Sequence, residues 1–220
     1  TQFEVPDARR MFACFEQPDL KATFTVSVTA PDQWEVVSNA ATPEPKAVRD
    51  GVARWEFAPT PRLSTYVTAL DAGPYHVERE VYEGPNGTIP LGVFIRRSLA
   101  QHLDTDAVLE VTRQGFAFFE ETFAVPYPFG KYDQLFVPEF NGGAMENAGA
   151  VTLREEFIPR SRVTDAAYER RGMVILHEMA HMWFGDLVTM KWWNDLWLNE
   201  SFATWAAAVS QAEATRWRDA

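Results

Sequence analysis

Two histidines four residues apart, His177 and His181, stand in a stretch whose apolar residues recur with a helical period. Residues four apart lie about 40° from each other around an α-helix, so both imidazoles can reach one metal ion. Glu178 follows the first histidine and would project beside that ion. Because zinc prefers nitrogen and oxygen ligands in a tetrahedral arrangement, this spacing predicts a zinc site on a helix.

A catalytic zinc site needs a third protein ligand and keeps its fourth position open for water. Glu200 is the candidate, because eighteen residues separate it from His181 and a helix is predicted directly after it, at 201–211. Asn194 or Asp195 would cap that helix. Packed against the first helix, it would carry Glu200 to the open side of the histidine pair. The competing interpretation is an amphipathic helix with two ordinary histidines and solvated carboxylates, but only four histidines occur in 220 residues.

A second motif, Gly143-Ala144-Met145-Glu146-Asn147, lies about thirty residues before the first histidine. Small residues let another backbone come close, and an extended segment offers N–H and C=O groups to a bound peptide. Glu146 places a carboxylate at the end of that strip. Taken alone, the motif is also compatible with a glycine-containing surface loop that exposes a glutamate.

The zinc motif with its gap to Glu200, together with the 143–147 motif, resembles the aminopeptidase N family of zinc metallopeptidases, whose fold is related to thermolysin. The resemblance covers nearly the whole chain. It implies an α+β fold, in which the C-terminal part of an antiparallel β domain is followed by the first half of a thermolysin-like catalytic domain. It further implies one zinc ion per chain, on His177, His181 and Glu200, and a hydrolase that removes N-terminal residues from peptides.

The resemblance also implies a set of substrate-binding residues. Glu146 matches the carboxylate that holds the free α-ammonium of the substrate, and Gly143 and Ala144 match residues that bind its backbone. Glu4 matches a second anchor for the ammonium, and Gln2 matches a residue that lines the pocket for the first side chain. Without the resemblance, side chains so near a terminus would be read as solvated.

Glu178 is expected to be the catalytic base and then the acid, because it can take a proton from water and return it to the leaving amine. Two departures from the family pattern accompany this expectation. The tyrosine that stabilises the oxyanion would lie beyond Ala220, so the chain is expected to be a fragment that lacks it. The family often has an acidic residue seven positions after the third ligand, but this sequence has Ala207 there. Carboxylates of this kind orient zinc-bound histidines, and Asp186 and Asp195 are the candidates for that role here.

A turn sequence at 71–74, Asp-Ala-Gly-Pro, divides the chain into a β domain over residues 1–74 and a catalytic part over residues 75–220. Segments in which apolar and polar residues alternate predict strands at 21–29, 52–57 and 65–69 in the first part. In the second part we expect strands at 76–82, 91–95 and 133–138 and a helix at 105–122. We expect the zinc-motif helix to start after Thr164 or Asp165, either of which would cap it, and to stop at Gly185.

The composition is that of an ordinary soluble protein, with 46% hydrophobic and 14% aromatic residues. A net charge of −11 argues against nucleic acid or an anionic membrane surface as a partner. The single Cys14 cannot form an intrachain disulfide, and the sequence contains neither a signal segment nor an apolar run of membrane-spanning length. A cytoplasmic location is therefore expected, and peptides with a free N-terminus are the expected partners. The oligomeric state and the preferred N-terminal side chain are not indicated.

Two alternatives stay open. The first is another hydrolase on the same scaffold, such as an endopeptidase or an epoxide-hydrolase-like enzyme. An aminopeptidase would be distinguished from these enzymes because it releases free amino acids from unblocked peptides and does not cleave N-acetylated ones. The second is a non-catalytic peptide-binding protein that keeps zinc for structure. The presence of Glu178 argues against the second, because a structural site needs no general base.

Overall fold

The computed structural model describes residue 3 and residues 7–218, and its N-terminal part is built from antiparallel strands. In one sheet the order is β1 (Ser27–Pro31), β4 (Val52–Glu56) and β3 (Lys46–Arg49). A second pair joins β2 (Glu35–Ser38) to β5 (Leu70–Gly73). The expected antiparallel β domain ahead of an α+β part is thereby confirmed.

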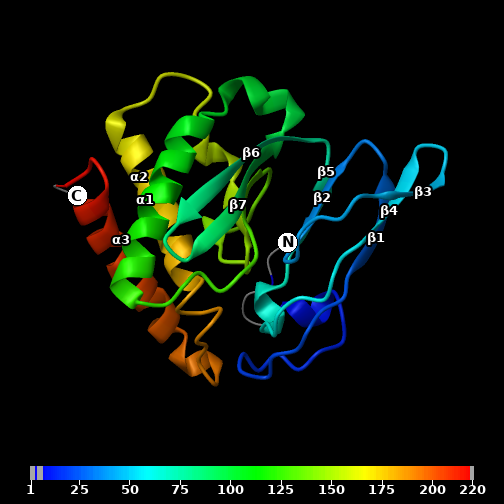
Figure 1. Ribbon diagram of the computed structural model, residues 1–220, viewed down its shortest axis with the longest axis horizontal. Helices are drawn as coiled ribbons and strands as arrows, with labels where there is room; N and C mark the ends of the chain where they lie inside the picture. The colour runs from blue at the N-terminus through cyan, green and yellow to red at the C-terminus, as the bar shows by residue number, and fades with distance from the viewer. Residues whose placement is uncertain (1–2, 4–6, 219–220) are drawn as a thin grey trace.

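The second part of the chain is a five-stranded mixed sheet with three helices. Its strand order is β6 (Tyr75–Gly84), β7 (Gly87–Arg96), β8 (Tyr132–Val137), β10 (Ala150–Arg154) and β9 (Ala144–Met145). The three inner strands are parallel, and the two outer strands run antiparallel to their neighbours. The helices α1 (Thr105–Phe123), α2 (Asp165–His181) and α3 (Trp197–Ala214) gather on one side of this sheet (Figure 1).

Alternate side chains of β7 enter two different hydrophobic cores, as the pleat of a strand requires. Leu91, Val93 and Ile95 lie in the core that the helices form. Phe94 instead packs in a cluster with Val37 and Ala69, which belong to the N-terminal part. The central sheet is therefore covered on both faces, by helices on one and by the N-terminal strands on the other (Figure 1).

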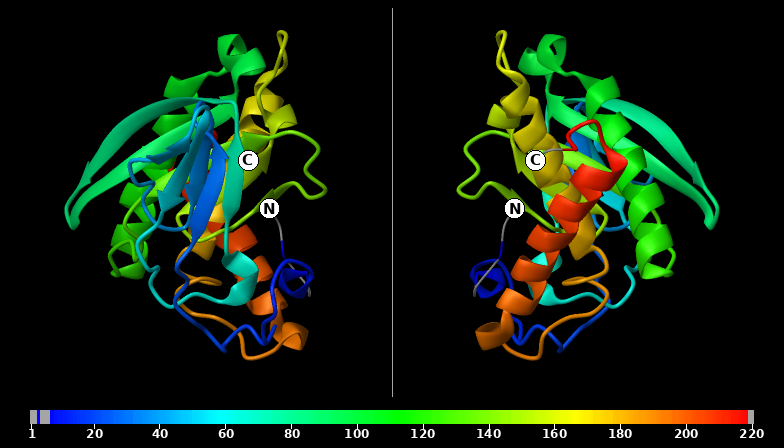
Figure 2. Two further views of the ribbon diagram at one scale, coloured as in Figure 1. Left: turned by 90° about the vertical axis from the view of Figure 1, so that its right-hand side faces the viewer. Right: turned by 90° about the vertical axis from the view of Figure 1, so that its left-hand side faces the viewer.

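The helix that carries both histidines, α2, is held from two sides. It packs closely against α1 at Gly115 of that helix. A Cβ added there would lie only 2.7 Å from Leu176 Cδ2 and 2.8 Å from Met179 Sδ, so no larger residue fits without a shift. On its other side α2 packs along α3, which crosses it in Figure 2. The two histidines, on the same helix as Leu176 and Met179, are thus fixed relative to the core.

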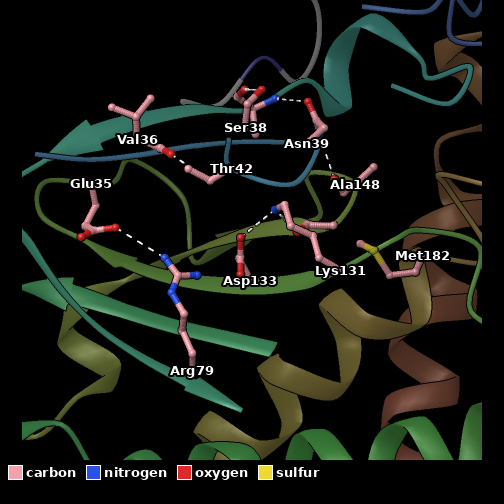
Figure 3. Close-up of polar contacts among 12 residues, drawn as sticks. Glu35, Val36, Ser38, Asn39, Thr42, Arg79, Lys131, Asp133, Ala148 and Met182 are labelled. Atoms are coloured by element: carbon pink, nitrogen blue, oxygen red, sulfur yellow. Dashed lines mark hydrogen bonds and ion pairs between the residues drawn. The ribbon is translucent and has the colours of Figure 1, made fainter. Parts of the chain in front are cut away.

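Polar contacts join the N-terminal strands to the central sheet (Figure 3). The side-chain amide of Asn39 donates to the carbonyl oxygens of Val67 and Ala148, both at 2.9 Å. Arg79 Nη2 lies 3.5 Å from Glu35 Oε2 at the exposed rim of the same interface. Since Ala148 follows Glu146 by two residues, Asn39 fixes the backbone next to that carboxylate.

Several predicted boundaries differ from the structure. The first N-terminal strand is Ser27–Pro31, so only residues 27–29 of the expected segment 21–29 are in it. The expected strand 65–69 contains a 3₁₀ helix over Thr65–Val67. The zinc-motif helix ends at His181 rather than at residue 185, because the chain turns there and Gly185 takes a φ of 141°. Neither Asn194 nor Asp195 caps α3, because both lie in a preceding 3₁₀ helix, Trp193–Asp195.

The expected domain boundary near residue 74 stays a prediction, although β5 ends at Gly73 and β6 begins at Tyr75. Among the described residues, no helix combines the length and the apolar character needed to cross a membrane.

Candidate active site

The side chains of His177, His181 and Glu200 come together where α2 packs on the first turn of α3. The two imidazole Nε2 atoms are 3.0 Å apart. Glu200 Oε2 lies 3.3 Å from His177 Nε2 and 3.7 Å from His181 Nε2. The three predicted metal ligands therefore converge on one point between two helices.

These separations can be compared with those that zinc requires. Tetrahedral bonds of about 2.0–2.2 Å separate neighbouring ligand atoms by roughly 3.3–3.6 Å. The observed distances of 3.0, 3.3 and 3.7 Å fall around that range. Two imidazole nitrogens and one carboxylate oxygen also form a ligand set typical of catalytic zinc. The residues present fit a zinc ion.

The second nitrogen of each imidazole has a partner that orients the ring. Nδ1 of His181 lies 3.1 Å from the carbonyl oxygen of Phe184, and Nδ1 of His177 lies 3.4 Å from Thr204 Oγ1. A carbonyl only accepts hydrogen bonds, so Nδ1 of His181 carries a proton and Nε2 is the nitrogen left to bind a metal.

These partners differ from Asp186 and Asp195, which the sequence suggested as the groups that orient the histidines. The carboxylate oxygens of Asp186 have no hydrogen-bond partner within the described part of the chain, and Asp195 Oδ1 accepts from the side chain of Asn194. Thr204 was missed, although its position one helical turn after Glu200 is a usable signal. The Phe184 carbonyl depends on the backbone turn after α2, which no side-chain pattern reveals.

Carboxylates dominate the electrostatics of the site. Burial alone would lower the pKa of the completely buried His181, but Glu146, Glu200 and Glu178 outweigh burial and raise that pKa to about 10. Burial works to raise the pKa of Glu200, yet its hydrogen bonds with both histidines lower it well below the usual range. The site thus favours positive charge, which is what a metal ion supplies.

Glu178 and Glu146 lie beside His181, one of the three ligands. Both side chains are buried, with exposed fractions of 5% and 3%. One carboxylate oxygen of each and a ring nitrogen of His181 lie within 4.8 Å of one another. The structure therefore brings the predicted general base and the predicted ammonium anchor together next to His181.

Gly143 and Ala144 lie at the free edge of the central sheet. Ala144 pairs with Leu153 through β9, the outermost strand, and the Gly143 carbonyl accepts from the Arg154 N–H at 3.1 Å. No heavy atom lies within 4 Å of the point where a Cβ of Gly143 would stand. An extended peptide can add to such an edge through its backbone, because neither side chain obstructs it.

The conformation after Glu146 is fixed by Asn147. Its side-chain nitrogen donates to the Thr68 carbonyl oxygen at 3.0 Å, and its side-chain oxygen accepts from Thr152 Oγ1 at 3.0 Å. The next residue, Ala148, donates its N–H to the Val67 carbonyl oxygen. Glu146 is therefore held between the central sheet and the N-terminal part, which explains how a buried carboxylate keeps one position.

Two further polar side chains near the site were not anticipated. Tyr132 is fully buried in β8, and burial, then Glu178 and Asp186, raise its pKa well above the usual value. Lys21, from the N-terminal part, donates through Nζ to the backbone carbonyls of Asp186 at 2.6 Å and Leu187 at 3.0 Å. The proposed substrate residues Gln2 and Glu4 lie outside the described residues.

Comparison with known proteins agrees with these features. The Peptidase M1 N-terminal domain matches residues 1–67, and the Peptidase family M1 domain matches residues 107–219. Aminopeptidase N of Streptomyces lividans is 68% identical over 214 residues, which cover 97% of this chain and 24% of that protein. Aminopeptidase Ey of Gallus gallus and aminopeptidase N of Homo sapiens are each 39% identical, over 93% of this chain and 21% of their own length. The chain thus spans about a quarter or less of each of these curated relatives.

Proposed function

Because the chain belongs to peptidase family M1, we propose that it forms the metal-binding part of a zinc-dependent aminopeptidase, which removes N-terminal residues from peptides. The observation that carries this proposal is the convergence of His177, His181 and Glu200 at zinc-like separations. The names of the relatives, all aminopeptidases, support the same reaction class. One zinc ion per chain is part of the proposal.

In this proposal Glu178 moves the protons of the reaction. Bound zinc would polarise the scissile carbonyl and lower the pKa of water. Glu178 takes a proton from the water that attacks the carbonyl carbon and delivers it to the nitrogen of the leaving amine, whose C–N bond breaks. Its near-complete burial keeps competing water away from this transfer.

Glu146 would determine that only the terminal residue is removed. A peptide α-ammonium is largely protonated near neutral pH, and a buried carboxylate can hold it through charge-assisted hydrogen bonds. With the peptide backbone along Gly143 and Ala144, this contact places the first peptide bond at the ligand cluster. By resemblance, Glu4 would be a second anchor and Gln2 would line the pocket for the first side chain.

Blocked and unblocked substrates test the proposal. The full-length protein that contains this chain should release free amino acids from peptides with a free N-terminus and leave N-acetylated peptides intact. A purified Glu178→Gln variant is the control for a contaminating peptidase. Cleavage inside blocked peptides would indicate an endopeptidase instead, and tight peptide binding without cleavage would indicate the non-catalytic alternative. The expected cytoplasmic location stays a prediction.

A further inference from the structure

We propose that Lys21 and Tyr66 of the N-terminal part are positioning residues for the zinc ligands. Lys21 acts on His181 through the turn that follows α2, and Tyr66 acts on Glu200 through the residue before it. The proposal rests on the zinc assignment in the proposed function, but it does not depend on the peptidase reaction.

The zinc ligands come from two helices that are joined by the connecting stretch, residues 182–196. His177 and His181 lie on α2, whereas Glu200 lies on the first turn of α3. The connecting stretch is a turn followed by the short 3₁₀ helix Trp193–Asp195. A metal site needs its ligands held at a fixed spacing, so contacts that hold this stretch also hold the site. In both views of Figure 2 the stretch, drawn in orange, runs beside the N-terminal segment, drawn in blue.

Lys21 binds the turn directly after α2. Its Nζ donates to the carbonyl oxygens of Asp186 at 2.6 Å and Leu187 at 3.0 Å. The same turn carries the Phe184 carbonyl that orients the His181 ring, and the Asp186 N–H donates to the His181 carbonyl oxygen at 2.9 Å. Hydrogen bonds from a charged donor are roughly twice as strong as neutral ones. Lys21 therefore holds the turn that holds His181.

The surroundings of Lys21 make this contact more than a surface hydrogen bond. The side chain is partly withdrawn from water, and this burial is the main cause that lowers its pKa. A partly desolvated ammonium depends on its hydrogen-bond acceptors, because water no longer replaces them fully. Loss of the ammonium should therefore release the turn.

Tyr66 makes the corresponding contact with the start of α3. It is 1% exposed, and its ring packs edge-on against Trp193. Its hydroxyl oxygen accepts a hydrogen bond of 3.2 Å from Nδ2 of Asn199, the residue before Glu200. The backbone carbonyl of Glu16, also in the N-terminal part, accepts from Trp193 Nε1 at 2.9 Å. The segment that carries Glu200 is thus docked on the N-terminal part.

Lys21 and Tyr66 belong to one support. The residue after Lys21, Ala22, forms an isolated antiparallel bridge with Leu63, with backbone hydrogen bonds of 3.0 and 2.9 Å. Tyr66 follows Leu63 by three residues. Because this bridge ties the two positioning residues together, the segments of His181 and Glu200 are held against the same piece of the N-terminal part.

The experiment measures metal affinity in the full-length protein. Lys21→Met removes the ammonium and keeps an extended side chain, and Tyr66→Phe removes only the hydroxyl. Groups that contact metal-binding histidines contribute about 10–100-fold to metal affinity, so these variants, which act one step further away, should weaken zinc binding by about threefold to tenfold. Competition with a chelator measures this. Lys191→Met, at an exposed position, and Tyr82→Phe, on β6 at the opposite edge of the sheet from β9, should bind zinc like the unsubstituted protein.

Co²⁺ in place of zinc gives a second readout, because its visible absorption depends on the coordination geometry. Lys21→Met and Tyr66→Phe should change this spectrum, and the two control variants should not. Unchanged affinity with an unchanged spectrum in both variants would overturn the proposal. Weaker binding with an unchanged spectrum would also overturn it, because the metal would then be lost through unfolding of the whole protein. Absence of bound metal from the unsubstituted protein would instead refute the zinc assignment, and this proposal with it.

Discussion

Thr204 Oγ1 lies 3.4 Å from Nδ1 of His177, one helical turn beyond Glu200 on the same helix. The hydroxyl is exposed, so its removal should disturb the ring without disturbing the core. Groups that orient metal-binding histidines typically contribute about 10–100-fold to metal affinity. Because this contact is long and neutral, Thr204→Val should weaken zinc binding by about tenfold, as measured by competition with a chelator. Thr204→Ser restores the hydroxyl and should bind zinc like the unsubstituted protein; equal affinities for all three proteins would exclude an orienting role.

Glu178→Gln should keep the zinc and lose most of the activity. The amide preserves the shape of the side chain, but it cannot accept and return a proton. General acid–base groups typically contribute ~10²–10⁴-fold, so kcat should fall by at least that order. Steady-state kinetics on an unblocked peptide, with zinc content measured on the same sample, checks this. A variant with near-full turnover would mean that another group transfers the proton.

Glu146→Ala should act mainly on substrates with a free N-terminus. A charge-assisted hydrogen bond contributes roughly 1.5–3 kcal/mol, which corresponds to about a ten- to hundredfold lower kcat/KM for unblocked peptides. Hydrolysis of a blocked peptide, where detectable, should fall much less because it never used this contact. Glu4→Ala should change activity in the same direction. Equal losses on blocked and unblocked substrates would leave Glu146 as a structural residue only.

Asn39 offers a test of how Glu146 is positioned. Besides its two donated bonds, Asn39 Oδ1 accepts from the Ala69 N–H at 2.8 Å, and the side chain is buried. Asn39→Ala leaves these backbone groups unsatisfied and should lower the free energy of unfolding by about 1–3 kcal/mol in chemical denaturation. It should also raise KM for unblocked peptides.

The exposed Arg79–Glu35 pair of the same interface provides the matched control (Figure 3). Glu35→Gln removes only a surface ion pair, which is worth about 0–1 kcal/mol. It should leave both the stability and the KM near their original values. If Asn39→Ala behaved like Glu35→Gln, the N-terminal part would not fix the Glu146 segment through this amide.

The pairing of the two histidines was predictable because it depends on local periodicity, whereas the fold class followed from the resemblance to the aminopeptidase N family. Two histidines four residues apart share a helix face wherever the helix lies, and the apolar pattern of 105–122 anticipates α1 (Thr105–Phe123) to within one residue. The expected strand 65–69 was wrong because Thr65, Val67 and Ala69 alternate as they would in a strand. Buried contacts override that pattern: Tyr66 packs edge-on against Trp193, at a ring distance of 5.2 Å, and the segment is a 3₁₀ turn.

The partners of the imidazole Nδ1 atoms illustrate what the sequence leaves open. The carbonyl of Phe184 meets His181 only because the chain turns after α2, with Gly185 at a φ of 141°. A backbone carbonyl carries no residue-specific signal, so the sequence suggested nearby carboxylates such as Asp186 instead. The Asp186 carboxyl is buried without a hydrogen-bond partner among the described residues, and burial, then Glu146, raise its pKa well above the usual value.

Zinc content is the most direct test of the proposed metal site. After dialysis against zinc-free buffer, elemental analysis should find one zinc ion per chain in the unsubstituted protein and a large loss in His181→Ala. His102→Ala, which removes a histidine remote in sequence from the motif, should keep the full amount. Undiminished tight zinc binding in His181→Ala, or no bound zinc in the unsubstituted protein, would contradict the assignment of His177, His181 and Glu200 as the zinc ligands.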